Sequence, residues 1–493
     1  MPNRKPPIPL YFTSLEIENV RCFGGPQRLD LTAGNGQPAR WTLLLGDNGV
    51  GKTTLLQCLA WMRLVPDDKE PPKEPQPEGR PLAKGDAVDE LPPLAAGQLG
   101  HGLQEEENEV LERLLRVRGG EKLRLTARLS FDSRLSSVGQ RANGPGKIIE
   151  TGVELLFNAK RELLEFAYEP KDRLRIETTF EKEFYEPVVV AYGANRQRGL
   201  QNVETGELDD PIASRRLSEL TELYDVEELL SGLDYASRKP TGAGRESKRQ
   251  LARLKDALAT ILPGDDFEAA DIEISPPDVI DSGERSGVYL RRNFSGSVPL
   301  SALSLGYQTT LAWTADLAWR LLKRYPGSTD PLAEPAVVLI DEIDLHLHPL
   351  WQLRILDDIA KIFRGTQFVA TSHSPLIVQV AEDANVVLLR QRETEVEIVK
   401  DPEDVRRWRV DQILTSELFG LPGARNKKTE ALFTRRDELA MKSSRSAEEE
   451  AELENLRLQI SELPTAQDPE DQRAMELIRK AAALLKEHKV VES

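Results

Sequence analysis

Residues 46–53 (GDNGVGKT) have the residue types and spacing of a loop that binds phosphate. Two glycines five positions apart precede Lys52 and Thr53, an apolar run at 41–45 leads in, and an amphipathic segment at 54–60 leads out. A loop between a buried strand and a helix can turn its backbone N–H groups toward an anion. Lys52 can then reach the β and γ phosphates of a nucleotide, and the Thr53 hydroxyl can bind Mg²⁺. The alternative is a glycine-rich turn without chemistry, which the flanking strand and helix disfavour.

Asp341 and Glu342 directly follow a second apolar run, residues 336–340 (AVVLI). Asp341 suits an outer-shell ligand of Mg²⁺. Glu342 is placed to orient and deprotonate an attacking water. The alternative is a strand that ends in an acidic turn, and the phosphate-binding loop upstream favours the chemical interpretation.

Residues 303–308 (LSLGYQ) place Ser304, Gly306 and Gln308 at the start of a long apolar helix, predicted over 305–322. Backbone N–H groups and a serine hydroxyl at such a position can bind an anion. Alternatively, Ser304 is a simple N-cap of that helix.

His373 follows a buried strand predicted at 367–370, within residues 370–375 (ATSHSP). A neutral imidazole there can hydrogen-bond to a γ-phosphate or to the attacking water. A lone histidine is more often structural, but the position of His373 favours a role in the site.

The elements that must position these residues form a β–α–β order. Strands are predicted at 336–340 and 367–370 with a helix at 350–363 between them, and further buried strands at 187–192 and 386–389. This order predicts a parallel sheet covered by helices, which is an α/β fold.

Together these motifs resemble those of ABC-type ATPases of the SMC/RecF/OLD-like group. Residues 16–23 resemble the opening strand of that group, 46–53 its Walker A motif, 303–308 its signature, 339–342 its Walker B motif and 344–349 its D-loop, and His373 its switch histidine. The resemblance implies an ABC-ATPase type of P-loop NTPase fold: a mixed sheet flanked by helices, with a helical insertion and a helical C-terminal tail.

The resemblance also implies ATP and Mg²⁺ as cofactors, held between two copies of the chain. By this carry-over, Glu342 activates water, His373 senses the phosphate, and Thr53 and Asp341 bind the metal. Gln197, in the segment 191–197 after a predicted strand, is the candidate for the glutamine loop. The implied nucleotide contacts are Arg21, Asn48, Gly49, Gly51, Lys52, Thr53, Thr54, Gln197, Ser304, Gly306, Gln308 and Asp344.

Within the group, the stretch 408–421 (WRVDQILTSELFGL) and the short helical tail after it look like PtuA-type ATPases of Septu and retron defence systems. That type implies regulation of a separate HNH nuclease partner and of DNA cleavage, with no nuclease in this chain. The alternatives are a RecF- or SMC-like repair ATPase and a nucleotide-gated scaffold that hydrolyses ATP slowly. No heptad pattern long enough for a coiled-coil arm is present.

Four domains are predicted. An N-terminal lobe spans 1–200 and includes a disordered, proline-rich insertion at about 66–98; a helical insertion spans 201–270; a C-terminal lobe spans 271–400; and a helical region spans 401–493. The last of these is acidic, and it is interpreted either as a protein-docking element or as a solvated lid on the sheet.

Composition and net charge limit which binding partners and which cellular compartment are expected. The net charge of −17 argues against a chain coated with DNA-binding surface, although a local basic groove stays open. The densest basic run lies within 238–255, and it is interpreted as a solvated helix face. Two cysteines and no membrane-length apolar run predict a cytoplasmic protein.

Overall fold

The computed structural model describes the elements that carry the motifs. The described residues are 8–9, 11–34, 36–61, 122–130, 149–158, 163–167, 184–185, 188–201, 220–262, 267–275, 287–292, 296–399, 402, 404–405, 408–421, 426–442 and 444–461. The predicted insertion at 66–98 lies outside them, and so does 470–489, where the sequence pattern predicts a helix within the region 401–493. The chain divides into two units, Met1–Gly420 and Leu421–Ser493, which are described separately.

The first unit is built on a six-stranded sheet with the order β18-β17-β4-β16-β15-β9. All of its strand pairs are parallel except β17 with β18. The mixed sheet predicted from the sequence is therefore confirmed. Its strands are β4 (Trp41–Leu45), β9 (Val188–Tyr192), β15 (Ala336–Ile340), β16 (Thr366–Thr371), β17 (Asn385–Gln391) and β18 (Val396–Val399).

Both faces of this sheet are covered, which explains why its central strands are apolar throughout. All five residues of β15 are buried, and side chains of alternate residues enter different hydrophobic clusters. Val338 and Ile340 pack with α7 (Leu305–Arg324) and α9 (Ile355–Ile362), whereas Val337 and Leu339 pack toward α1 (Lys52–Trp61). This is the pattern of a sheet buried on two sides.

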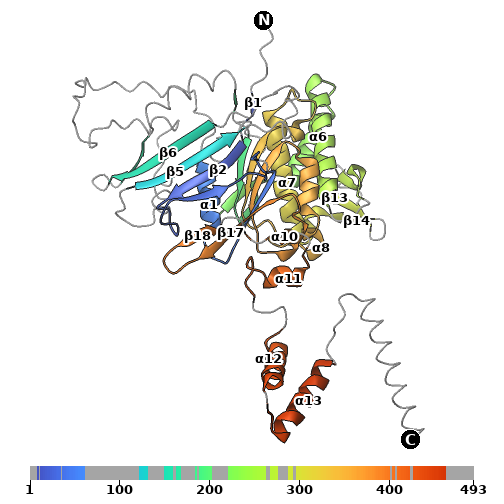
Figure 1. The fold of residues 1–493 in the computed structure, drawn as a ribbon. Helices are drawn as coiled ribbons and strands as arrows, with labels where there is room; N and C mark the ends of the chain where they lie inside the picture. The colour runs from blue at the N-terminus through green and yellow to red at the C-terminus, as the bar shows by residue number, and fades with distance from the viewer. Residues whose placement is uncertain are drawn as a thin grey trace, which may run out of the picture. The chain divides into compact units, whose positions relative to one another are not determined.

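A second sheet of five antiparallel strands lies on the α1 side (Figure 1), with the order β3-β2-β5-β6-β7. Apolar residues on both sides of a turn at 24–26 predict a strand pair over 11–31, and the first two strands of this sheet confirm it. The strands are β2 (Tyr11–Glu18), β3 (Gln27–Asp30), β5 (Lys122–Ser130), β6 (Ile149–Asn158) and β7 (Leu163–Ala167).

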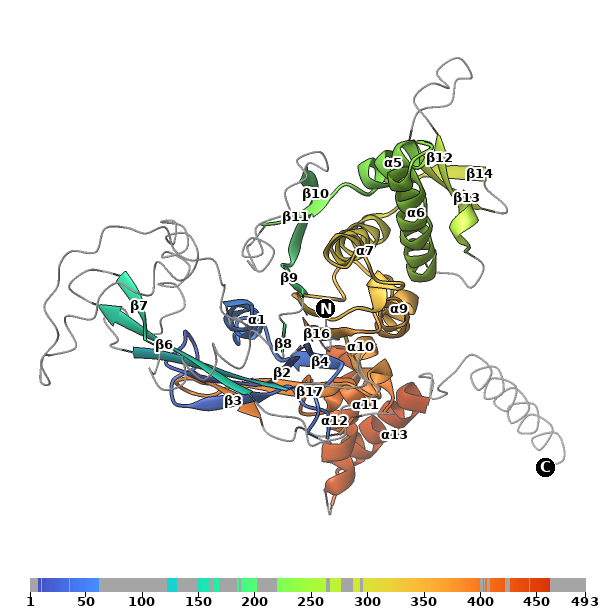
Figure 2. The ribbon, with the colours of Figure 1, turned by 90° about the horizontal axis from the view of Figure 1, so that it is seen from above.

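On the other side, α7 packs with a helical hairpin formed by α5 (Val226–Ser237) and α6 (Gly242–Ile261), as Figure 2 shows from above. Two small sheets accompany this hairpin. One is antiparallel, with β12 (Ile272–Ser275), β13 (Gly287–Arg292) and β14 (Gly296–Pro299), and the other pairs β10 (Asn195–Gln201) with β11 (Leu220–Tyr224). The described part of the helical insertion predicted at 201–270 is mostly helical, as α5 and α6, but it also contains the strand β11, which precedes the two helices.

The helix predicted at 350–363 is broken into α8 (Pro349–Gln352) and α9. Arg354 leaves the helical region of backbone space with φ −131°, and its guanidinium donates to Asp358 Oδ2 at 2.6 Å. The first unit also contains the short helices α10 (Pro375–Val380) and α11 (Val410–Thr415) and a parallel pair of two-residue strands, β1 (Ile8–Pro9) and β8 (Phe184–Tyr185).

In the second unit, α12 (Lys427–Met441) and α13 (Ala447–Ser461) pack on each other through Leu439, Leu453 and Leu456. The sequence pattern predicts a helix over 448–463 within the helical region 401–493, and α13 confirms it. Its described partner is α12, on its N-terminal side.

Candidate functional site

The phosphate-binding loop connects β4 to α1, as the sequence predicted. Gly49 and Gly51 have φ values of +82° and +88°, which residues with a side chain rarely adopt. A Cβ on Gly51 would lie 2.4 Å from the Cys22 sulfur, so this position also lacks space for a side chain. Asn48 and Gly49 are exposed at the tip of the loop, where a ligand can approach.

Lys52 is the first residue of α1, and its side chain reaches back to the loop. Its ammonium donates to the backbone carbonyls of Gly46 and Asp47, at 2.9 and 2.8 Å. Burial lowers the pKa of Lys52 below its ordinary value, and the nearby carboxylates of Asp341 and Glu342 partly oppose that shift. A buried ammonium bonded only to carbonyls can exchange them for phosphate oxygens.

Asp341 connects the phosphate-binding loop to the neighbouring strands. Thr53 Oγ1 donates to Asp341 Oδ2 at 2.8 Å, and Thr371 Oγ1 donates to Asp341 Oδ1 at 2.6 Å. Strand order brings these groups together, because β16 lies between β4 and β15 and all three run parallel. The structure thus joins Thr53 and Asp341, both predicted as metal ligands, and adds Thr371, which the sequence motifs did not single out.

These oxygens fit Mg²⁺, a hard cation that prefers oxygen ligands and keeps several waters and substrate phosphates. One carboxylate and one hydroxyl are then enough from the protein. Among the described residues, no group of three or more His, Cys, Asp or Glu side chains could hold a metal.

Glu342 lies in a left-handed backbone conformation, with φ +50°. Its N–H donates to Thr371 Oγ1 at 2.7 Å, so one hydroxyl orients both acidic residues. Arg196 Nη2 donates to the backbone carbonyls of Asp341 and, at 3.3 Å, Glu342, while its Nε donates to Gly193 at 2.9 Å. The turn that carries Glu342 is therefore held from two sides.

Arg196 is a second residue that the sequence motifs did not single out. It lies beside Gln197 in β10, and the side chain of Gln197 is outside the described part of the structure. Burial lowers the pKa of Arg196 to about 10, and the nearby carboxylate of Asp341 opposes that shift. The available signal was a cation four residues after the end of a buried strand, past a short connection that begins with Gly193.

His373 is exposed at the end of β16. Its backbone N–H donates to the Asp344 carboxylate at 3.3 and 3.4 Å, so the predicted switch histidine lies beside the predicted D-loop. Elsewhere, Arg21 Nη1 donates to the buried Thr54 Oγ1 at 3.4 Å, so these two predicted contacts also lie together.

Gly306 of the predicted signature lies against the predicted D-loop of the same chain. A Cβ on Gly306 would lie 2.2 Å from the His346 carbonyl oxygen, so the glycine permits this close approach. Ser304 is exposed at the start of α7, and its side chain makes no capping hydrogen bond. Gln308 Nε2 donates to the Ser301 and Leu303 carbonyls at 2.7 and 2.6 Å, so it holds the preceding turn.

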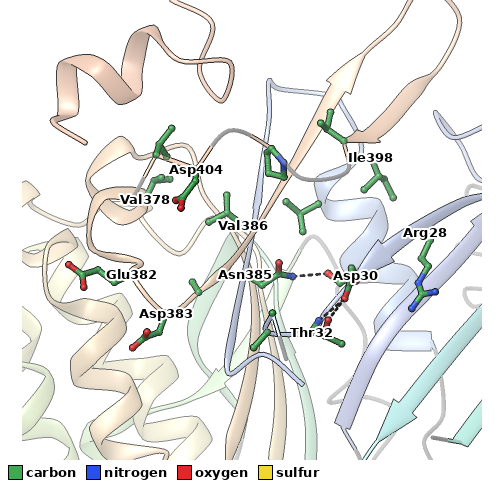
Figure 3. A pocket seen from close by; sticks show the side chains of 17 residues that line it. Arg28, Asp30, Thr32, Val378, Glu382, Asp383, Asn385, Val386, Ile398 and Asp404 are labelled. Atoms are coloured by element: carbon green, nitrogen blue, oxygen red, sulfur yellow. Dashed lines mark hydrogen bonds between the residues drawn. The ribbon is translucent and has the colours of Figure 1, made fainter. Parts of the chain in front are cut away.

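A cavity of about 840 Å³ lies elsewhere in the first unit (Figure 3). Side chains at the ends of β3 and α10 and at the start of β17 line it, and Asn385 Nδ2 donates to the Asp30 carbonyl at 2.7 Å. None of the predicted nucleotide contacts lines this cavity, so it is distinct from the candidate site.

Two family models match the chain. One, described as an AAA domain, matches residues 14–258, and the other, described as "AAA domain, putative AbiEii toxin, Type IV TA system", matches residues 195–379. The chain is similar to AAA-type ATPases.

Within the described residues, no helix is both long and apolar enough to cross a membrane.

The chain is also similar in sequence to individual proteins with names. The chain is 33% identical over 204 residues to the Retron Ec83 probable ATPase of Escherichia coli, covering 41% of this chain and 35% of that protein. It is 34% identical over 163 residues to the Septu protein PtuA of Bacillus mycoides (strain KBAB4), covering 33% of this chain and 22% of that protein. These matches confirm the resemblance to PtuA-type and retron ATPases. The chain spans well under half the length of both relatives.

Among solved structures, the SMC head domain from Thermotoga maritima aligns over 80% of this chain and 99% of that chain. The identity is 14% and the TM-score 0.37, a likeness too distant to bear on function.

Proposed function

We propose that this chain binds and hydrolyses Mg²⁺-ATP. The observation that carries the proposal is the 2.8 Å hydrogen bond between Thr53 Oγ1 and the Asp341 carboxylate, which brings the predicted Walker A and Walker B motifs to one point. A hydroxyl and a carboxylate so close, beside the buried ammonium of Lys52, match the groups that phosphoryl-transfer sites use.

Each residue has a separate task in this mechanism. Lys52 exchanges the Gly46 and Asp47 carbonyls for phosphate oxygens and stabilises their charge. Glu342 takes the proton of the attacking water, and His373 donates a hydrogen bond to the transferred phosphate. Thr53 and Asp341 would hold Mg²⁺, which when bound would neutralise part of the negative charge of the phosphates.

We further propose that two copies of the chain complete each site. The Ser304 side chain is exposed and does not cap its own helix, so it is available to a second chain. Apolar side chains around the signature and D-loop support this face as an interface: Leu305 is 53% exposed, Leu350 70% and Leu353 37%. Exposed leucines that flank polar ligand groups are typical of a surface that another protein covers.

The role that we propose for this ATPase is the regulatory subunit of an anti-phage defence system, controlling a separate HNH nuclease on DNA. The names of the Septu and retron relatives support it. A RecF-like repair ATPase would instead prefer gapped or junction DNA and need no nuclease partner.

Glu342→Gln is the decisive variant. Phosphate release should fall about a hundredfold or more, because the general base is lost, while ATP binding persists and ATP-bound dimer accumulates. Glu393→Gln, at an exposed position of the hairpin between β17 and β18, removes the same charge and should leave turnover at the wild-type rate. Normal turnover in Glu342→Gln would refute the assignment. ATP binding with negligible wild-type turnover would instead identify a nucleotide-gated scaffold.

A further inference from the structure

The turn between α5 and α6 carries a basic surface that the ATPase mechanism does not use. Within the basic run 238–255, the structure places Arg245, Lys248 and Arg249 on the side of α6 that faces solvent, while Leu251, Leu254 and Leu258 of the same helix are buried. The name hairpin surface is used here for five side chains: Tyr235, Lys239, Arg245, Lys248 and Arg249.

The cations of the hairpin surface are available to a ligand. Arg245 and Lys248 are exposed, and neither side chain has a hydrogen bond or ion pair within the described residues. Arg249 is 67% exposed and lies 3.5 Å from Glu246, a loose ion pair. Arg245 is three and four positions from the other two, and like charges at this spacing repel one another on a helix. An anion bound across these residues would relieve that repulsion.

Tyr235 adds a second kind of contact. It is 70% exposed, and the Lys239 ammonium lies 5.7 Å from its ring centroid. An exposed ring beside cations is the combination with which proteins bind single strands, since bases stack on the ring while cations contact the phosphates. An acidic protein partner would need the cations but not the exposed ring.

We propose that the hairpin surface binds DNA with unpaired bases, with the backbone phosphates on Arg245, Lys248 and Arg249 and a base stacked on Tyr235. The contrast with a chain of net charge −17 supports a local site rather than general attraction to polyanions. The inference rests on the proposed function only for the choice of DNA as the ligand, and it does not depend on ATP hydrolysis.

The first test measures fluorescence anisotropy of a labelled 30-nucleotide single strand with the full chain, without nucleotide, over a range of salt concentrations. The Arg245→Gln/Lys248→Gln double variant should bind at least about tenfold more weakly, with the slope of log affinity against log salt smaller by about 1 to 2. The matched control is Lys427→Gln/Lys428→Gln, which makes the same charge change at two exposed positions of α12 and should bind as wild type does. Equal binding by the hairpin variant and the control would overturn the proposal.

The second test addresses the ring. Tyr235→Ala should weaken single-strand binding about fivefold or more, whereas Tyr235→Phe should retain it, because stacking uses the ring face. Loss with both variants, or with neither, would contradict stacking. Displacement of a weakly held strand by polyglutamate, with no effect of Tyr235→Ala, would identify an acidic-protein surface instead.

Two further measurements separate this inference from the ATPase proposal. All hairpin variants should bind a fluorescent ATP analogue as wild type does, which also shows that they fold. Glu342→Gln should bind the single strand with wild-type affinity even if its turnover is lost. A strand bound only when ATP is hydrolysed would overturn the hairpin surface as the site.

Discussion

Thr371 is the residue on which the geometry of the acidic pair most depends. Its single hydroxyl donates to the Asp341 carboxylate and accepts from the Glu342 N–H, at 2.6 and 2.7 Å. Without it, the Glu342 N–H loses its partner and the left-handed turn loses a restraint. Displacing a catalytic group by a fraction of an ångström is enough to slow a reaction severely.

Thr371→Val should therefore lower phosphate release about tenfold to a hundredfold, because one buried donor is left unpaired and Glu342 shifts. Thr371→Ser keeps the hydroxyl and should restore most of the rate. Thr366→Val, on the same strand, is the control: the buried Thr366 hydroxyl has no partner among the described residues, so its loss should leave turnover unchanged. Similar losses in both valine variants would show that packing, not the hydroxyl, matters.

Cys58 and Cys22 should differ in reactivity. Complete burial in α1 raises the pKa of the Cys58 thiol to about 12, so at pH 8 only about one molecule in ten thousand carries the reactive thiolate. Titration with a thiol reagent should label Cys22 alone in the native protein and both cysteines after unfolding. Because Cys22 lies against Val50 and Gly51, ATP should slow its labelling. Rapid native labelling of Cys58 would contradict its placement.

Several site residues could be predicted from the sequence because their motifs are local. Lys52 and Thr53 lie within eight residues of one loop, and Asp341 and Glu342 directly end a strand. Thr371 and Arg196 could not be assigned a role this way, because their partners in the acidic turn, Asp341 and Glu342, are 29 to 146 positions away along the chain. Such contacts exist only once the sheet has set the strand order.

At the level of elements, the buried Asp316 anchors α7, the helix that carries the signature at its start. Its carboxylate accepts from the Tyr192 hydroxyl of β9 at 2.7 Å, from Arg320 Nε at 2.7 Å and from the Tyr224 N–H at 3.4 Å. The backbone carbonyl of Tyr192, at the end of β9, also accepts a hydrogen bond from the Asp341 N–H at 2.8 Å. Tyr192 therefore holds both α7, through Asp316, and the acidic turn, through Asp341.

Tyr192→Phe should lower the free energy of unfolding by about 1.5 to 3 kcal/mol, since the lost hydrogen bond has a charged acceptor that stays buried. Tyr325→Phe is the matched comparison, because the Tyr325 hydroxyl donates to the neutral Pro335 carbonyl at 2.7 Å and should contribute only about 1 kcal/mol. Urea unfolding of the three proteins measures both differences. An equal effect of the two variants would show that the charge of Asp316 adds nothing.

The elements themselves were predicted best where hydrophobic pattern alone determines them. The strands β4, β15 and β16 and the helix α7 follow from continuous apolar runs or a clear helical period. The break between α8 and α9 could not be predicted from the hydrophobic pattern, because it depends on the backbone conformation of Arg354 and on its contact with Asp358. Likewise, β11 was hidden within a segment of helical period.

At the level of the whole molecule, the proposed sandwich makes a prediction that no single chain can meet. In a two-fold dimer each site takes its Walker motifs from one chain and its signature from the other. Lys52→Ala removes the first half, and Ser304→Arg removes the second by placing a bulky cation at the exposed start of α7. Each variant alone should therefore be nearly inactive.

An equimolar mixture of these two variants should recover about a quarter of the wild-type rate of phosphate release, because half of the dimers are mixed and each of those has one intact site. The control mixes Lys52→Ala with Glu342→Gln, whose defects lie in the same half of the site, so no dimer gains an intact site and no recovery is expected. Full activity of Ser304→Arg alone would show that one chain completes its own site. Recovery in the control would show that Lys52 and Glu342 of one site come from different chains. No recovery in the first mixture, with mixed dimers demonstrated by cross-linking, would likewise exclude a shared pocket.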